Sequence, residues 1–372
     1  MDEERMDQII TERWNDYVMF GGETEVLDFF KHYYQKRKGH LLFIIGKGFD
    51  PRMNNMLKLF LKTELSVSLT CLLVDFPSSE ESEYQEFIDR NIKDFKDLAA
   101  GHFDVESISA NFSEGSTKGN LLLRKKLETI SFNDYSDVIL DVSSLPKAVY
   151  FNIVKYVYDN VTDDHHTNVF VAASENVKID ESIQEARGDE VEPIIGFRAD
   201  WDRTSTMNKN RVMICLLGEG KQDVLSYLFA KDNVNDVYPV LPFPSDNPRR
   251  NDDLLLEYSR FLNKEFRVEP QNIIYAHESN PFELYRILSR FKREYGATLQ
   301  LIPEEVVYHV AILTSKLLSI GALLFGLENP EDVLIYNISA VDYTINNKEN
   351  LFKLNGDSKP FLMWIKGEAY DK

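Results

Sequence analysis

Short apolar runs recur along the first part of the chain, and each ends in a polar turn that leads into helix-forming sequence. Nearly every position in these runs is apolar, which is typical of parallel strands in a sheet covered on both faces. The predicted strands are residues 41–45, 66–74, 137–142 and 168–173, and the predicted helices are 53–62, 82–98, 120–130 and 147–159. The polar residues 99–118, with Gly and Ser, predict a surface loop.

The pattern fades over the acidic, polar segment 174–207 and restarts at Arg211. The strands predicted beyond this point are 211–217, 237–241, 272–275, 298–302, 333–336 and 361–365, with helices at 221–230, 254–266 and 281–295. The last of these strands is expected at an antiparallel edge. The apolar segment 306–327 is long enough to span a membrane, but His309 and Lys316 interrupt it. We therefore expect a buried helix there and no membrane contact.

Residues 3–38 are predicted to form two helices broken at Gly21 and Gly22, and together they make an N-terminal helical arm. This arm carries many aromatic side chains: Trp14, Tyr17, Phe20, Phe29, Phe30, Tyr33 and Tyr34. Aromatic residues are enriched at buried interfaces as well as in cores. The arm therefore either packs on its own sheet or docks a second copy or another protein, so a homo-oligomer or a protein complex is expected.

The order of elements predicts an α/β fold with two Rossmann-like parallel-sheet halves. The expected units are a helical arm at 1–38, a first domain at 39–205 and a second domain at 206–372. The halves share two marks in the same order, which suggest an internal duplication, although chance also explains such short matches. The marks are Gly46-Lys47-Gly48 with Gly218-Glu219-Gly220, and Phe76-Pro77-Ser78 with Phe243-Pro244-Ser245. A cleft between two such halves is a common place for a ligand.

Charge and cysteine content narrow the class of protein. The formal net charge is −19 and the sequence pI is about 4.9, which argues against general nucleic-acid binding. A small nucleotide in a local pocket remains compatible with this charge. Cys71 and Cys215 both lie in apolar runs and are expected to be buried, reduced thiols. The acidic N-terminus lacks the layout of a signal peptide, so we expect a cytoplasmic protein.

The turn at Gly46 and Gly48 is the first candidate binding site. A glycine-rich turn that opens a helix presents free N–H groups to an anion. Asp75 ends the second strand, where an acid would bind ribose hydroxyls, but Pro51 replaces the third glycine of the dinucleotide fingerprint. Asp50 would repel a phosphate, whereas Arg52 could bind one with two hydrogen bonds. The alternative is that the glycines only make a tight turn.

Two stretches resemble known families. Residues 45–50 resemble the glycine-rich turn of the abortive-infection H family, Gly-Asn-Gly-Phe-Asp, with Lys47 departing from it, and are distantly similar to the sirtuin-like opening Gly-Ala-Gly-x-Ser. Residues 314–321 resemble the Thr-Lys-apolar-Gly helix start of CRISPR-associated Rossmann-fold sensors, which bind cyclic oligonucleotides. The second resemblance makes Lys316 a candidate ligand-binding residue. Both families belong to bacterial antiviral systems, and together the resemblances imply a defence-associated protein that handles nucleotides.

Other polar groups are expected at strand ends of the two sheets. Gly218 and Gly220 repeat the glycine turn in the second half, and Arg249 with Arg250 could hold a phosphate or carboxylate there, the alternative being a solvated loop. Asp141 ends a strand of the first half. His277 ends a strand of the second half, as a general base or as part of a helix-capping loop. No metal site is predicted, because Asp164-His165-His166 lacks a third ligand.

Two classes of function follow from these observations. The first is a sensor or scaffold that binds a nucleotide-like ligand or protein partners in a defence assembly. The second is a hydrolase that consumes a nucleotide or NAD, with Asp50, Asp141 and His277 as the candidate catalytic residues. The ligand-binding candidates common to both are Gly46, Gly48, Arg52, Asp75, Gly218, Gly220, Arg249, Arg250 and Lys316. Both an enzyme and a binding protein are consistent with the sequence, which implies no specific cofactor.

Overall fold

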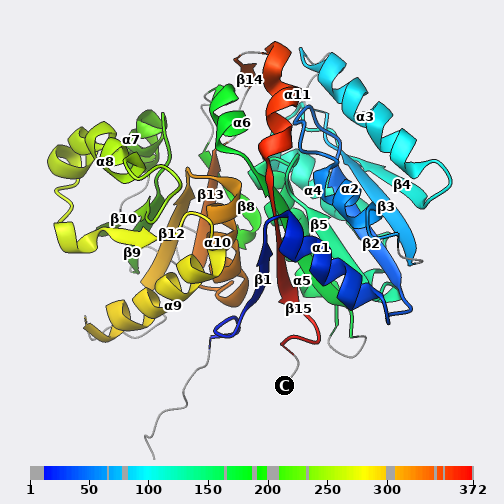
Figure 1. Cartoon of the computed structure of the whole chain (residues 1–372). Helices are drawn as coiled ribbons and strands as arrows, with labels where there is room; N and C mark the ends of the chain where they lie inside the picture. The colour runs from blue at the N-terminus through cyan, green and yellow to red at the C-terminus, as the bar shows by residue number, and fades with distance from the viewer. Residues whose placement is uncertain are drawn as a thin grey trace, which may run out of the picture.

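The computed structural model divides into two halves, each built around a mainly parallel sheet with helices on both faces (Figure 1). It describes residues 12–64, 67–77, 83–162, 166–186, 191–198, 209–231, 234–298, 306–338, 342–346 and 348–370. The expected α/β fold with two Rossmann-like halves is confirmed. The fold follows from the strand composition, since strands such as 40–46 are buried at almost every position and can only lie inside a covered sheet.

The first sheet has seven strands in the order β1-β15-β6-β5-β2-β3-β4. The strands are β1 (Val18–Gly21), β2 (His40–Gly46), β3 (Ser68–Asp75), β4 (Asp104–Ser109), β5 (Asp137–Asp141), β6 (Asn168–Glu175) and β15 (Lys359–Lys366). The strands β4-β3-β2-β5-β6 are parallel, and β15 runs antiparallel between β6 and β1. The first parallel strand in the chain is thus central, as in a doubly wound sheet.

The second sheet repeats this order with six strands, β11-β10-β9-β12-β13-β8. They are β8 (Val191–Arg198), β9 (Asn210–Leu216), β10 (Asp236–Pro242), β11 (Ile274–Ala276), β12 (Val306–Ile312) and β13 (Val333–Ile338). The strands β9 to β13 are parallel, and β8 is antiparallel to β13. In both halves, therefore, the parallel strand that comes first in the chain, β2 or β9, is central. The parallel strand that comes last, β6 or β13, pairs with an antiparallel strand.

The helices form outer layers and one shared inner layer. They are α1 (Glu23–Tyr34), α2 (Asn55–Leu61), α3 (Gln85–Ala99), α4 (Ser116–Leu127), α5 (Lys147–Asn160), α7 (Gln222–Lys231), α8 (Arg250–Glu257), α9 (Pro281–Thr298) and α10 (Lys316–Glu328). Helices α1 to α3 cover one face of the first sheet, and α7 and α8 cover one face of the second. The remaining faces share one continuous apolar core with α4, α5, α9 and α10, so the two halves are packed against each other.

A small cap lies over the carboxyl ends of the first sheet, at the top of Figure 1. It consists of α6 (Val177–Ser182), α11 (Leu351–Leu354) and a separate two-stranded sheet, β7 (Ile183–Ala186) with β14 (Asp342–Ile345). Its apolar cluster contains Ile179, Ile345 and Leu351, with Tyr84 and Phe49 of the first half. The cap therefore rests on the loop that follows β2.

The N-terminal arm joins the two halves instead of standing apart. Residues 18–21 form β1, so the expected helix is replaced there, and the first helix among the described residues is α1. Trp14 is fully buried, and its indole N–H donates to the carbonyl of Ile365 at 2.9 Å. Its ring packs edge-on against Tyr285 of α9, with the two ring centroids 5.1 Å apart. Tyr17 stacks on Phe282 of α9 at 4.6 Å. These arm residues thus pack within their own chain. Positions 1–11 lie outside the described residues.

Two further predictions about single elements were wrong, for physical reasons. The expected loop 99–118 contains the edge strand β4, in which all positions but one are exposed, so its polar residues hid it. The expected helix 306–327 is the strand β12 followed by α10. Every residue of β12 is buried, and buried segments show no periodicity that separates strand from helix. The expected strand 298–302 falls mainly outside the described residues, and its first residue ends α9.

The sheets do not divide at the expected domain boundaries. The last strand, β15, comes from the unit expected at 206–372 but lies in the first sheet, and it is an internal strand because β1 covers it. In the opposite sense, β8 comes from the unit expected at 39–205 but covers the second sheet. Each antiparallel strand forms hydrogen bonds with backbone N–H and C=O groups that would otherwise be unpaired at the edge of the parallel strands. The halves are therefore interlaced.

Within the described ranges, none of the helices combines the length and the apolarity needed to cross a membrane. The apolar segment around Lys316 is accounted for by the shared core, because the middle of α10 is buried on all sides. Cys71 and Cys215 are free and buried, as expected.

The bridging role of the arm can be tested at Trp14. Trp14→Ala should lower the free energy of unfolding by about 3–5 kcal/mol, because it empties a buried site between β15 and α9. Urea unfolding followed by circular dichroism measures this loss. Leu256→Ala, at a side chain that is 73% exposed on α8, is the matched control and should change stability by no more than about 0.5 kcal/mol. Equal effects of the two changes would contradict the bridging role.

Candidate functional site

Each half has a switch point, where the chain's first parallel strand lies beside the fourth. In the first sheet β2 lies beside β5, and in the second β9 lies beside β12. Ligands of doubly wound sheets bind outside the carboxyl ends of the strands at such points. Gly46 ends β2 and Gly48 follows it, and Gly218 and Gly220 follow β9, so the two glycine turns occupy corresponding places.

The glycines allow neighbouring loops to approach closely. A Cβ atom at Gly46 would lie 2.4 Å from a methyl carbon of Leu145, and one at Gly48 would lie 3.0 Å from the carbonyl oxygen of Ser144. In the second half, a Cβ at Gly218 would lie 2.1 Å from the carbonyl oxygen of Leu313. Gly220 instead has a φ of 72° and donates its N–H to Glu257 at 2.6 Å. Three of the four glycines therefore bring the two sides of a switch point together.

Charged side chains from both halves gather where the first sheet meets α10. We call this group the junction cluster; it contains Asp50, Arg52, Asp141, Glu175, Asp180 and Lys316. Four of the six were expected as site residues, namely Asp50, Arg52, Asp141 and Lys316. Glu175 and Asp180 were not, because the first ends an apolar strand and the second lies in the segment where the sequence pattern fades.

Arg52 is the best-anchored member of the cluster. It is only 2% exposed, and its guanidinium binds Asp50 through Nε at 2.9 Å and through Nη2 at 2.7 Å. Nη2 also reaches Asp180 of the cap at 2.8 Å, and Nη1 donates to the carbonyl of Ser174 at 3.3 Å. Burial alone would raise the pKa of Asp50, but the charge and hydrogen bonds of Arg52 hold it below its ordinary value. The Asp50–Arg52 pair is therefore ionised and fixed.

Asp141 is buried with only one of its carboxyl oxygens in use. Oδ1 accepts hydrogen bonds from the backbone N–H of Ser143, at 2.9 Å, and from the Ser143 hydroxyl, whereas Oδ2 has no partner among the described residues. Burial raises the pKa of Asp141 to about 7, against the effect of these hydrogen bonds. A carboxyl with one free oxygen and this pKa can accept or donate a proton near neutral pH.

The first residues of α10, Lys316 and Leu317, are the part of the second half that contacts this cluster. Lys316 is partly buried and donates its ammonium to the carbonyl of Ser143, and the N–H of Leu317 donates to Glu175 Oε1 at 2.9 Å. A carboxylate at a helix N-terminus is favourable because of the helix dipole. Burial lowers the pKa of Lys316, although Asp50 partly offsets this. Burial and the nearby Asp180 raise the pKa of Glu175 to about 7.

Two further hydroxyls near these strand ends are buried without a partner among the described residues. They are Ser174 Oγ, next to Glu175 at the end of β6, and Thr314 Oγ1, between β12 and Lys316. Ser174 is 2% exposed and Thr314 5%. Buried polar atoms are normally hydrogen-bonded, so unpaired ones call for an explanation. Here they lie at or near the point where both sheets end, together with Asp141 Oδ2.

Asn91 of α3 holds the turn that carries Asp50. Its amide donates to the carbonyls of Gly48 and Asp50, both at 2.9 Å. Asn91 is 3% exposed, so it is a fixed support. No sequence signal marks it, because its role depends on the packing of α3 beside the turn.

The remaining candidates lie elsewhere. Asp75 is paired with Lys47 at 2.9 Å. In the second half, Arg250 is bound at both ends of its guanidinium, by Glu219 at 2.6 and 2.9 Å and by Glu278. The side chain of Arg249 is exposed in the same loop. His277 Nδ1 accepts the N–H of Ser279 at 3.1 Å just before α9. Arg249, Arg250 and His277 therefore belong to the strand ends of the second sheet and not to the junction cluster.

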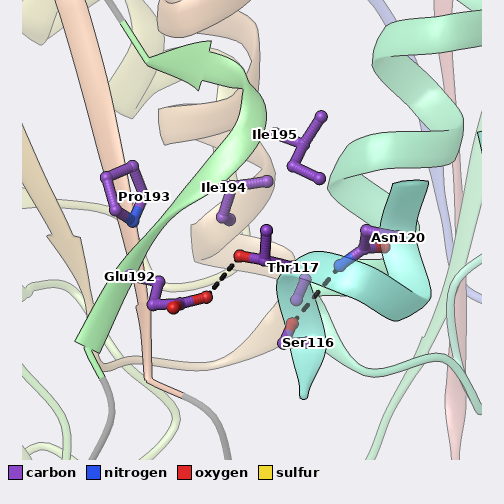
Figure 2. Close-up of a pocket in the computed structure, with 8 residues that line it drawn as sticks. Ser116, Thr117, Asn120, Glu192, Pro193, Ile194 and Ile195 are labelled. Atoms are coloured by element: carbon purple, nitrogen blue, oxygen red, sulfur yellow. Dashed lines mark hydrogen bonds between the residues drawn. The ribbon is translucent and has the colours of Figure 1, made fainter. Parts of the chain in front are cut away.

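A separate small pocket lies between α4, α5 and β8, at another contact of the two halves (Figure 2). Thr117 donates to Glu192 across it, and the Asn120 amide lies 3.3 Å from Ser116 Oγ. Asn120 also accepts from Asn152 at 3.2 Å. These polar groups satisfy one another, unlike the oxygens of the junction cluster. Among the described residues, no group of three or more histidine, cysteine or acidic side chains is arranged to hold a metal ion.

Comparison with known proteins gives no family. No family model matches the chain, and no curated protein matches it. Among solved structures, a Pseudomonas aeruginosa UCBPP-PA14 chain assigned to the universal stress proteins is 8% identical with a TM-score of 0.25, over 86% of this chain and 98% of that one. UGT89C1 of Arabidopsis thaliana is 11% identical with a TM-score of 0.22, over 82% and 70%. We therefore interpret the site from its own geometry.

The raised pKa values make stability depend on pH. Asp141 and Glu175 bind protons more tightly in the folded state, where their pKa is about 7, than in the unfolded chain, where it is about 4. The stabilisation is therefore complete below about pH 4 and is lost as the pH rises towards 7, by up to about 1.4 kcal/mol per pH unit for each group. Asp141→Asn should flatten this fall, as measured by urea unfolding at a series of pH values.

Asp246→Asn provides the control, since the Asp246 side chain is 64% exposed and lies outside the cluster. It should keep the slope of the wild type. A wild-type protein whose stability rises steadily from pH 4.5 to pH 7, or an Asp141→Asn variant with an unchanged slope, would argue against a buried carboxyl of raised pKa.

Proposed function

We propose that this protein is a sensor that binds a nucleotide-like ligand at the junction cluster. The observation that supports this most is the set of unpaired buried oxygens near the strand ends, Asp141 Oδ2, Ser174 Oγ and Thr314 Oγ1. A ligand with hydroxyl or N–H donors can satisfy the carboxylate, and its acceptors can use the hydroxyls and the ammonium of Lys316. Ribose and base edges offer donors and acceptors of this kind.

The composition of the site favours sensing. Asp141 and Ser174 come from the first half and Lys316 from the second, so one ligand would contact both halves at once. A ligand stabilises the conformation that it binds best, and here that conformation includes the contact between the halves. We also propose, from the sequence resemblances, that the protein serves a bacterial antiviral system. A cytoplasmic location is proposed from the free, buried thiols of Cys71 and Cys215, and a homo-oligomer or protein complex from the aromatic residues of the N-terminal arm.

A second candidate is a hydrolase that consumes a nucleotide or NAD. The observation in its favour is that Asp141 and Glu175 both have a pKa near 7, which suits general acid–base catalysis. Asp50, the other candidate acid of the cluster, is less suitable because Arg52 keeps it ionised. Chromatography of NAD and nucleoside triphosphates after incubation with the protein separates this candidate from a sensor, which leaves its ligand intact.

Thermal melting tests the site. ATP, ADP, NAD and a cyclic oligoadenylate are added singly to the wild type, and at least one should raise the melting temperature. At a concentration of 100 Kd the ligand stabilises by about 2.7 kcal/mol. Lys316→Met should remove most of this shift, because it takes away the cation that the second half contributes.

Lys359→Met is the matched control. Lys359 also joins the halves, through an ion pair with Asp246 at 3.0 Å. Its side chain is 61% exposed, and Lys359 does not belong to the junction cluster. This variant should keep the full ligand shift. The proposal fails if none of the four compounds shifts the wild type, or if Lys316→Met retains the shift of the control.

A further inference from the structure

The partners of Arg52 differ in how firmly they are held. Asp50 lies in the same turn, is 7% exposed and has its own backbone fixed by Asn91. Asp180 belongs to the cap, on the six-residue helix α6, and its side chain is 43% exposed. The guanidinium of Arg52 is buried, but the Asp180 carboxylate, unlike that of Asp50, keeps contact with water and regains its hydration readily when it leaves. The Asp180 carboxylate is therefore the partner that Arg52 can exchange at least cost.

The cap has few other polar connections to the loop after β2. The amide of Asn355 donates to the carbonyl of Pro51 at 2.8 Å and its oxygen accepts from Asn55 at 2.7 Å. Phe49 meets Tyr343 of β14 at 5.2 Å. The cap also meets the start of α3, where the Tyr84 hydroxyl donates to the carbonyl of Tyr343 and Lys348 pairs with Glu83 at 2.6 Å. The ion pair of Lys178 with Asp357, at 3.2 Å, lies within the cap and its connections. The link between Arg52 and Asp180 is thus a charged attachment of the cap at the site itself.

Charge balance favours exchange over addition at this site. The cluster holds two cations, Arg52 and Lys316, against the carboxyl groups of Asp50, Asp141, Glu175 and Asp180. An anion added to this set would meet an excess of negative charge, whereas an anion that replaces the Asp180 carboxylate keeps the balance. Asp50 takes the Nε and Nη2 side of the guanidinium, so a phosphate oxygen that replaces the Asp180 carboxylate would accept its hydrogen bond from Nη2. Ser174 adds a donor at this place: its carbonyl binds Arg52, and its hydroxyl has no partner among the described residues.

We infer that the ligand of the junction cluster carries an anionic group of the phosphate class, which takes the place of the Asp180 carboxylate on Arg52 and so releases the cap. This inference rests on the proposed function and adds the chemical class of the ligand and the way its binding is reported. Asp180 acts as a tethered carboxylate that occupies the anion site in the absence of the ligand.

Removal of the tethered carboxylate should strengthen anion binding. Asp180→Ala is titrated with inorganic pyrophosphate, and with the nucleotide that shifts the wild type, by isothermal titration calorimetry. Both should bind about tenfold more tightly than to the wild type. Amide hydrogen exchange over 177–186 should rise in the wild type when the nucleotide binds, and should already be raised in Asp180→Ala without it.

Asp357→Ala is the matched control, because it removes one negative charge and an ion pair to α6 but does not touch Arg52. It should bind both compounds as the wild type does. If Asp180→Ala does not fold, Asp180→Asn keeps the shape of the side chain, removes its charge and allows the same comparison.

The outcomes separate the inference from the proposed function. A nucleotide that binds the wild type and Asp180→Ala equally, with unchanged exchange in the cap, overturns the displacement and leaves nucleotide binding intact. Pyrophosphate binding that strengthens in Asp180→Ala, with no nucleotide bound by either protein, supports the anion site and overturns the nucleotide. Equal strengthening by Asp357→Ala overturns the inference, because a general loss of negative charge would then explain it.

Discussion

The structure depends on how the second half meets the carboxyl ends of the first sheet. Parallel strands end with polar backbone groups and acidic side chains that cannot be buried without partners. Here α10 supplies them, since the N–H of Leu317 binds Glu175 and the ammonium of Lys316 binds the carbonyl of Ser143. The shared apolar core forms around this polar contact. Because Asp141 Oδ2 is left unpaired in the same place, the contact that joins the halves is also the place where a ligand has something to bind.

Much of the fold was predictable from the sequence because its signals are local. Strands such as β2 and β5 are short, have an unbroken run of apolar residues and are followed by turns, and that pattern directly indicates a covered parallel sheet. The elements that were missed lack such a signal. The edge strand β4 is polar because it faces solvent, and β12 merges with α10 because both are buried on every side. The strand β1 was missed because its pairing partner, β15, lies at the other end of the chain.

The candidate site was predictable in part. Asp50, Arg52 and Asp141 were expected because they follow strands, and Lys316 because of its resemblance to a known helix start. Their convergence was not predictable. It depends on how the two halves pack against each other, and Lys316 is more than a hundred residues from the other three in the chain. The glycine turns have a packing role that their spacing did not reveal. The spacing predicts a phosphate cradle, and in the structure Gly46 and Gly218 allow the loops after β5 and β12 to lie against them.

The interlaced strands have a consequence for synthesis on the ribosome. All strands of the second sheet lie between residues 191 and 338, so that sheet can be completed as soon as this stretch has emerged. The first sheet cannot, because β15 separates β6 from β1 and is formed by residues 359–366. The first sheet begins to form before the second but is completed after it, and a nascent chain exposes the open edge of β6 until residues 359–366 have been made. Removal of residues 359–366 would therefore damage the first sheet, although its other strands lie at least 180 residues earlier in the chain.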